Sequence, residues 1–212
     1  MSESRIFGLV GYPLSHSFSK GYFAKKFIKE GIDKVEYQNF PIQSIEDFLP
    51  LIDTNPHIKG LNVTIPYKEK IIPYLNELDP VADQIQAVNT IKFNNGKLIG
   101  YNTDVIGFEK SLLDFIQNKK IPRALILGTG GASKAVKFVL DKLKIPIDFV
   151  TSQLNSEYLE YHQLMENLSN YPLIINTTPL GMSPNINECP DIPYEELSTD
   201  FYLYDLIYNP PL

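Results

Sequence analysis

Two hydrophobic periods alternate along this chain and predict a mixed α/β protein. Short apolar runs of strand length are separated by longer stretches in which apolar residues recur every three or four positions, as on one face of a helix. In the first half, apolar runs predict strands at residues 5–11, 34–40, 58–65, 87–93 and 97–101. The last two flank Asn94-Asn95-Gly96, a turn sequence that favours a β-hairpin.

Helices are expected between these strands. The helix after the first strand has one apolar face, formed by Phe23, Ala24, Phe27 and Ile28. It would end at Gly31, which suits a left-handed cap. The remaining helices of the first half are expected at residues 45–52, 68–78 and 104–119. Ser44 and Asp47 form an approximate capping box before the first of these, and Pro73 would kink or break the second.

From Arg123 onward, the pattern is that of a nucleotide-binding α/β unit. Residues 123–128 form a continuous apolar run, as in strands buried on both faces of a parallel sheet. The run leads into a glycine turn and a helix whose apolar face consists of Ala135, Val136, Val139, Leu140 and Leu143. Three further strands are expected at residues 146–152, 171–179 and 201–208. Strand, glycine turn, helix and strand in this order form a right-handed crossover unit and predict a Rossmann-like domain.

Composition excludes several classes of protein. At 212 residues, with 43% hydrophobic and 21% charged residues, the chain suits one large globular domain or two small ones. A net charge of −6 argues against a nucleic-acid partner. The single cysteine excludes an internal disulfide and a cysteine-rich zinc site, and the widely spaced histidines predict no metal site. No signal peptide and no apolar segment of membrane-spanning length is found, so we expect a cytoplasmic protein without a membrane partner.

Gly128, Gly130 and Gly131 are the first candidates for ligand binding. A phosphate-binding turn needs glycines because backbone N–H groups must approach a pyrophosphate at a helix N-terminus. The strict pattern would have a glycine where this chain has Ser133. A tight turn without a ligand is the alternative, but the strand before it and the helix after it favour the phosphate site.

The segment LNVTIPYKEK, residues 61–70, carries polar groups that a plain strand-to-helix connection does not need. These are the amide of Asn62, the hydroxyl of Thr64 and the amine of Lys68. A lysine at a helix start is normally solvated, and the positive end of the helix dipole makes the position unfavourable. Local rules fail most often at functional sites, so Lys68 is predicted to act on a ligand.

Seven segments in one order resemble the motifs of the shikimate dehydrogenase family. They are GYPLSHSFS, LNVTIPYKEK, AVNTI, GYNTD, LGTGGASKA, NTTPLGM and YDLIYNP, and they span essentially the whole chain. The resemblance implies a substrate domain at residues 1–104, a Rossmann-like NADP domain at residues 105–212, and a cleft between them. It also implies reversible reduction of 3-dehydroshikimate to shikimate, in aromatic amino-acid biosynthesis, by a monomer or homodimer.

The resemblance assigns a set of substrate-binding residues. Ser15 and Ser17 match the serines that bind the carboxylate of shikimate in the family. Thr64, Asn89 and Tyr208 match positions that contact the ring hydroxyls or the carboxylate. Apart from the motifs, these residues would be ordinary turn serines, a buried amide and a core aromatic residue.

Lys68 and Asp104 match the catalytic pair of the family, and both also contact the substrate there. Hydride transfer to a carbonyl carbon builds negative charge on the oxygen, which a proton donor or a fixed positive charge must stabilise. An ammonium group beside a carboxylate meets that requirement.

The cofactor site follows from the same resemblance. It consists of Gly128, Thr129, Gly130, Gly131, Ala132, Thr151, Ser152, Thr177, Thr178, Met182 and Leu206. NADP-preferring members carry an arginine after the second strand of this domain, whereas VTSQLNSEY contains no arginine or lysine. The acidic residue with which NAD-binding domains hold the ribose is also missing. NADP is expected on the resemblance, and NAD stays open.

Two alternatives to a shikimate dehydrogenase remain at this point. One is a quinate dehydrogenase that uses NAD, although paired Ser15 and Ser17 favour shikimate. The other is a ligand-binding relative with weakened catalysis. The family pattern continues past YNP with a cofactor-contacting glycine, a shikimate-binding glutamine and a helix that returns to the first domain, whereas this sequence stops at Leu212. The full activity of these residues is therefore open, while Lys68 and Asp104 favour turnover.

Overall fold

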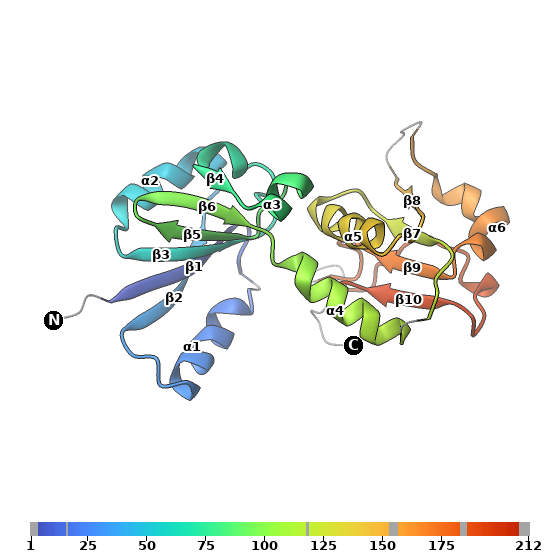
Figure 1. The fold of residues 1–212 in the computed structure, drawn as a ribbon, viewed down its shortest axis with the longest axis horizontal. Coiled ribbons are helices and arrows are strands. Elements are labelled where there is room, and N and C mark those ends of the chain that lie inside the picture. Colours follow the sequence, from blue (N-terminus) through green and yellow to red (C-terminus); the bar gives the residue numbers. More distant parts are fainter. Residues whose placement is uncertain (1–3, 16, 118, 153–156, 183–185, 208–212) are drawn as a thin grey trace. The chain divides into compact units, whose positions relative to one another are not determined.

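The chain forms two compact units. The computed structural model describes residues 4–15, 17–117, 119–152, 157–182 and 186–207. Its two units are Met1–Thr103 and Asp104–Leu212 (Figure 1), one residue away from the expected boundary of the functional domains. Among the described helices, none is both long and apolar enough to cross a membrane.

A six-stranded mixed sheet forms the first unit, in the order β2-β1-β3-β5-β6-β4. Its strands are β1 (Arg5–Gly11), β2 (Val35–Pro41), β3 (Ile58–Val63), β4 (Glu77–Leu78), β5 (Thr90–Asn94) and β6 (Lys97–Tyr101). Strand β1 pairs in parallel with β2 and β3, so these three strands have their carboxyl ends at one edge of the sheet. The expected hairpin between β5 and β6 is confirmed, with Asn95 and Gly96 at φ values of 50° and 79°.

Helices cover both faces of this sheet. Figure 1 shows α1 (Ser19–Lys29) on one side, and α2 (Phe48–Thr54) and α3 (Pro80–Ile85) on the other. The larger core joins Val10, Leu61, Val63, Ile91 and Leu98 of the sheet to Phe48 and Ala82. The expected cap at Gly31 is confirmed by its φ of 63°. Of the expected apolar face of α1, only Phe23 and Phe27 pack on the sheet, whereas Ile28 is 83% exposed.

The capping box of Ser44 and Asp47 is also confirmed. It opens a single 3-10 turn, η1 (Ile45–Asp47), which runs directly into α2.

The prediction of a helix at residues 68–78 is wrong. Turns at 68–71 lead into one 3-10 turn, η2 (Ile72–Tyr74), and then into β4. Pro73 provides no backbone N–H for a helix, and neighbouring segments take up the hydrogen bonds that a helix would have made. The carbonyl of Lys68 accepts a hydrogen bond from the N–H of Val88 (2.7 Å), and β4 pairs with β6. Lys68 is therefore not at a helix N-terminus, and the helix-dipole argument for it does not apply.

The second unit contains a four-stranded parallel sheet in the order β10-β9-β7-β8. Its strands are β7 (Ala124–Leu127), β8 (Ile147–Val150), β9 (Leu173–Asn176) and β10 (Tyr202–Asp205). The helices α4 (Asp104–Ile116) and α5 (Gly131–Lys142) pack against each other, and Phe108 and Phe115 of α4 make edge-on ring contacts with Tyr204 of β10. On the other face, Leu125, Leu127 and Ile174 share a core with Leu164 of α6 (Leu164–Asn167). Helices on both faces of a parallel sheet confirm the Rossmann-like prediction.

Candidate functional site

The parallel pairing of β1 and β3 gathers one group of candidate residues at an edge of the first unit. Beyond the last strand residues, the N–H of Thr64 donates to the carbonyl of Val10 (2.9 Å). The N–H of Tyr12 donates to the carbonyl of Ile65 (3.1 Å). These bonds hold the segment that carries Ser15 and Ser17 beside the segment that carries Thr64 and Lys68.

Ser17 has an uncommon environment for a hydroxyl. Its Oγ is buried and has no hydrogen-bond partner among the described residues. Buried polar groups in native proteins are nearly always paired, so an unpaired one requires a specific explanation. A ligand with an acceptor or donor at this position provides one. Ser15, two residues earlier, is exposed.

Buried neighbours fix the backbone around Lys68. The hydroxyl of Tyr67 donates to the carbonyl of Ile42 (2.8 Å), and burial raises the pKa of Tyr67, so the phenol keeps its proton. Ile71, four residues further on, is fully buried. The Lys68 side chain itself is half-buried, and Thr64 is also half-buried. The Lys68 amine and the Thr64 hydroxyl are therefore carried by a backbone that buried neighbours hold in place.

Asn89 is a hub of hydrogen bonds between three segments. Its backbone carbonyl accepts from the N–H of Val63 (2.8 Å), and its own N–H donates to the carbonyl of Tyr101 (3.0 Å). Its side-chain Oδ1 accepts from the N–H of Thr103 (2.9 Å) and from the hydroxyl of Thr90 (3.0 Å). Its Nδ2 donates to Oγ1 of Thr103 (3.0 Å). The side chain is only 8% exposed, so its orientation is set by these partners.

Two of these partners, Thr90 and Thr103, were not identified from the sequence. The signal that would have found them is their position in the AVNTI and GYNTD motifs, next to Asn89 and Asp104. Asp104 follows Thr103 directly and is the first residue of α4, where a carboxylate is favoured by the helix dipole.

The glycine turn of the second unit has the geometry that a phosphate site requires. Gly128 has a φ of +96°, and an added Cβ would lie 3.0 Å from Cγ2 of Thr178 and 3.1 Å from Oγ1 of Thr177. At Gly130, by contrast, an added Cβ would meet no atom within 4 Å, so the backbone there is open to a ligand. Helix α5 begins at Gly131, and the first N–H groups of a helix have no acceptor within the helix, which makes its N-terminus a place where an anion can bind. The arrangement fits a dinucleotide pyrophosphate.

Ser133 replaces the third glycine without disturbing the turn. Its side chain is 2% exposed, and its hydroxyl donates to the carbonyl of Gly130 (2.6 Å). A small residue whose hydroxyl is hydrogen-bonded in this way can take the place of the glycine in the strict pattern. Thr129 and Ala132, the other candidates of the turn, are half-buried.

A second turn of this unit follows β9. The hydroxyl of Thr177 donates to the carbonyl of Leu127 (2.7 Å) and ties this turn to the end of β7. Buried Asn176 accepts hydrogen bonds from the N–H (3.0 Å) and the hydroxyl (2.7 Å) of Thr178. Its Nδ2 donates to Asp205 (3.1 Å), at the end of β10. Asn176 is thus a further positioning residue that sequence reasoning missed, although a polar residue ending a buried strand was a usable signal.

The remaining cofactor candidates lie on the segments after β8, β9 and β10. The N–H of Thr151 donates to the carbonyl of Leu159 (3.1 Å), and the residue is buried, while Ser152 is exposed. Met182 and Leu206 are half-buried, and the N–H of Leu206 donates to the carbonyl of Asn176 (3.2 Å). Tyr208 lies outside the described residues.

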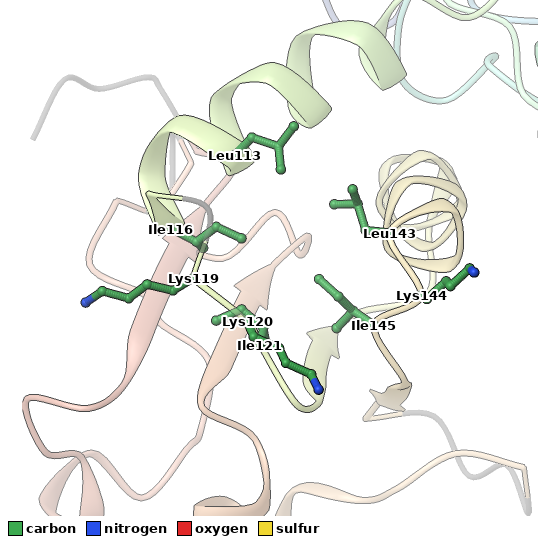
Figure 2. Close-up of a pocket in the computed structure, with 8 residues that line it drawn as sticks. All are labelled: Leu113, Ile116, Lys119, Lys120, Ile121, Leu143, Lys144 and Ile145. Carbon is green, nitrogen blue, oxygen red and sulfur yellow. The ribbon is translucent and has the colours of Figure 1, made fainter.

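One hollow of the second unit does not coincide with these candidates. Figure 2 shows a pocket of about 300 Å³ whose apolar side chains, among them Leu113, Leu143 and Ile145, point inward. The ammonium ends of Lys119 and Lys144 extend away from it (Figure 2). The pocket lies near the amino end of β7, whereas the glycine turn follows its carboxyl end. It therefore belongs to neither candidate group.

Comparison with known proteins gives one consistent result. A family model described as the shikimate dehydrogenase substrate binding domain matches residues 9–91. The shikimate dehydrogenase (NADP(+)) of Methanococcus vannielii is 36% identical, and the match covers 99% of this chain and 80% of the relative. A solved shikimate dehydrogenase from Aquifex aeolicus is 32% identical with a TM-score of 0.86, covering 97% of this chain and 79% of that one. Another from Thermus thermophilus, in complex with NADP(H) and shikimate, is 26% identical with a TM-score of 0.82, covering 97% and 80%.

The glycine turn generates a paired prediction. Gly128→Ala should lower the free energy of unfolding by about 1–3 kcal/mol, because a Cβ is strained at its positive φ and crowds two threonines. Gly130→Ala should change that free energy by less than about 0.5 kcal/mol, yet weaken dinucleotide binding by placing a methyl group on the open side of the turn. Urea unfolding and a dinucleotide titration of both variants test this. Equal stability of the two variants would show that the turn is not constrained as described.

Proposed function

This chain belongs to the shikimate dehydrogenase family, and we propose that it catalyses the NADP-dependent reversible reduction of 3-dehydroshikimate to shikimate. The observation that supports the substrate most directly is the set of polar side chains at one sheet edge of the first unit. This reaction serves the shikimate pathway, which leads to chorismate and the aromatic amino acids. We place the enzyme in the cytoplasm, with small-molecule substrates and no nucleic-acid or membrane partner, as a monomer or homodimer.

The chemistry of shikimate matches the residues proposed to bind it. The molecule has a carboxylate and three ring hydroxyls, so its site needs short side chains that donate and accept hydrogen bonds. Ser15 and Ser17 offer hydroxyls to the carboxylate, and Thr64, Asn89 and Tyr208 offer partners to the ring. The buried Oγ of Ser17, which finds no partner in the described part of the chain, supports this assignment, because a bound carboxylate would satisfy it.

Lys68 and Asp104 take the catalytic roles in this proposal. The ammonium group of Lys68 stabilises negative charge that develops on the substrate oxygen as its carbonyl is reduced. The carboxylate of Asp104 holds the reacting hydroxyl in place and exchanges a proton with it. The half-buried position of the Lys68 side chain supports its role, because a charge partly removed from water interacts more strongly with its partner.

The residues of the second unit fit the cofactor. The pyrophosphate would be held by backbone N–H groups at Gly130, Gly131 and Ala132 at the start of α5. Thr151 and Ser152 would flank the adenosine ribose, and Met182 and Leu206 would line the nicotinamide end. When bound, NADPH supplies the hydride that reduces the ketone.

Replacing Lys68 tests the catalytic assignment. Lys68→Met should lower kcat by about 10²–10⁴-fold and change KM by only a small factor, because the charge is needed chiefly in the transition state. The measurement is the absorbance change of the nicotinamide with shikimate or quinate and with NADP or NAD. Lys70→Met, at an exposed position in the same turn, is the matched control and should keep wild-type kcat. Near-normal turnover of Lys68→Met would remove Lys68 from the catalytic role.

The Ser17 hydroxyl gives a test that separates binding from folding. Ser17→Ala should raise KM for shikimate by roughly ten- to a hundredfold, the equivalent of one hydrogen bond to a charged group. The free energy of unfolding should not fall, because the hydroxyl has no partner to lose among the described residues. Steady-state kinetics and urea unfolding are compared with Ser169→Ala, an exposed serine of the second unit. A change in KM for the cofactor alone would place Ser17 outside the substrate site.

Cofactor preference is tested at Ser152. A neutral hydroxyl makes one hydrogen bond where a guanidinium makes a charged, bidentate contact with a phosphate. NADP should therefore bind the wild type better than NAD, and Ser152→Arg should strengthen NADP binding by roughly tenfold with little change for NAD. The gain should shrink at high salt, because exposed charges are screened. Titrations of both cofactors at two salt concentrations measure this, and a wild-type preference for NAD would contradict the assignment of this loop.

A further inference from the structure

A row of hydrogen bonds leads across the first sheet to Asn89. The hydroxyl of Tyr37 donates to Oδ1 of Asn62 (2.8 Å), and Nδ2 of Asn62 donates to Oγ1 of Thr90 (3.3 Å). The hydroxyl of Thr90 then donates to Oδ1 of Asn89 (3.0 Å). The first three residues come from β2, β3 and β5, and they line a groove of about 430 Å³ on the α1 face of the sheet.

The direction of this row follows from the chemistry of its members. A hydroxyl has a single proton to donate, whereas an amide has separate donor and acceptor ends. Burial raises the pKa of Tyr37 to about 12, although a hydrogen bond with Ser19 acts in the opposite direction, so the phenol is a donor at ordinary pH. The phenol donates to Oδ1 of Asn62, and this bond turns Nδ2 of Asn62 toward Thr90. Because Thr90 accepts that bond, its own proton is available for Asn89.

The consequence falls on the Asn89 side chain. Oδ1 of Asn89 receives two donors, the Thr90 hydroxyl and the backbone N–H of Thr103 (2.9 Å). The N–H of Thr103 is only a donor and cannot pair with Nδ2, whereas a hydroxyl could donate to Oδ1 or accept from Nδ2. The Thr90 hydroxyl supports the same orientation because its oxygen already accepts from Asn62 and its proton is directed at Oδ1 of Asn89. The amide is thus fixed with Oδ1 toward the Thr103 N–H and the Thr90 hydroxyl.

We propose that Tyr37, Asn62 and Thr90 are positioning residues that fix the Asn89 amide in the orientation in which it binds the substrate. The inference rests on the proposed function, in which Asn89 binds the ring of shikimate. Asn62, whose amide in the LNVTIPYKEK motif had no assigned role, then contributes to substrate specificity. Whether Nδ2 or Oδ1 of Asn89 faces the ligand decides which group of the ligand is recognised.

Substitution at Thr90 tests the proposal. Thr90→Val keeps the shape of the side chain but removes the hydroxyl, so Oδ1 of Asn89 loses one donor. KM for shikimate should rise by roughly three- to tenfold, the effect of one net hydrogen bond, with kcat within about twofold of wild type. Thr90→Ser restores the hydroxyl and should return KM to within about twofold of wild type. Thr54→Val removes an exposed hydroxyl at the end of α2, which bonds to the carbonyl of Pro50 (2.8 Å) and not to the row that leads to Asn89, and it should leave KM unchanged.

A readout that does not need turnover separates this inference from the proposed function. The side-chain amide resonances of Asn89, identified by their loss in Asn89→Asp, should shift and exchange faster with solvent in Thr90→Val but not in Thr54→Val. Tyr37→Phe should shift them in the same direction by a smaller amount. If the wild type reduces 3-dehydroshikimate but Thr90→Val changes neither KM nor these resonances, or if Thr90→Ser fails to restore them, the inference is overturned. If the resonances move while the wild type shows no activity, the orienting role stands and the proposed reaction fails.

Discussion

The parallel pairing of β1 with β3 is the constraint on which the proposed substrate site depends. Parallel neighbours end at the same edge of a sheet, so segments that are about fifty residues apart in the chain emerge side by side. The close approach also requires Gly11, because a Cβ there would lie 2.4 Å from Cγ2 of Thr64. A shift of this pairing by one residue would turn Thr64 to the other face of the sheet and separate it from the serines.

Asn89 shows that structural and substrate-binding roles need not exclude each other. Its backbone joins β3 to β6, and its side chain receives donors from Thr90 and Thr103. A buried amide carries a cost unless its groups are paired, and the pairing that removes this cost also fixes the direction of the amide. The same hydrogen bonds that stabilise the sheet therefore prepare the side chain for a ligand.

In the second unit, too, the contacts that hold the turns in place also shape the proposed ligand site. Gly128 adopts a conformation that other residues rarely reach, whereas Ser133 replaces an expected glycine because its hydroxyl bonds to Gly130. Asn176 organises the turn after β9 and links it to β10. Rigid turns at the carboxyl ends of parallel strands are where doubly wound folds bind nucleotides, which is consistent with the proposed cofactor site.

The sequence by itself determined all of the described strands except β4, most of the described helices, the hairpin at Asn95-Gly96 and the Rossmann-like order of the second half. These features are local, because hydrophobic period and turn chemistry act over a few residues. The motifs also determined the family, since each retains the residues that its chemistry needs. Only the tertiary structure decided the segment at residues 68–78, where hydrogen bonds to Val88 and the pairing of β4 with β6 replace the helix expected from local pattern. It alone showed the partners of Asn62 and a Ser17 hydroxyl that is buried without a partner among the residues the structure describes, because these depend on residues that are distant in the chain and meet only when the sheet has formed.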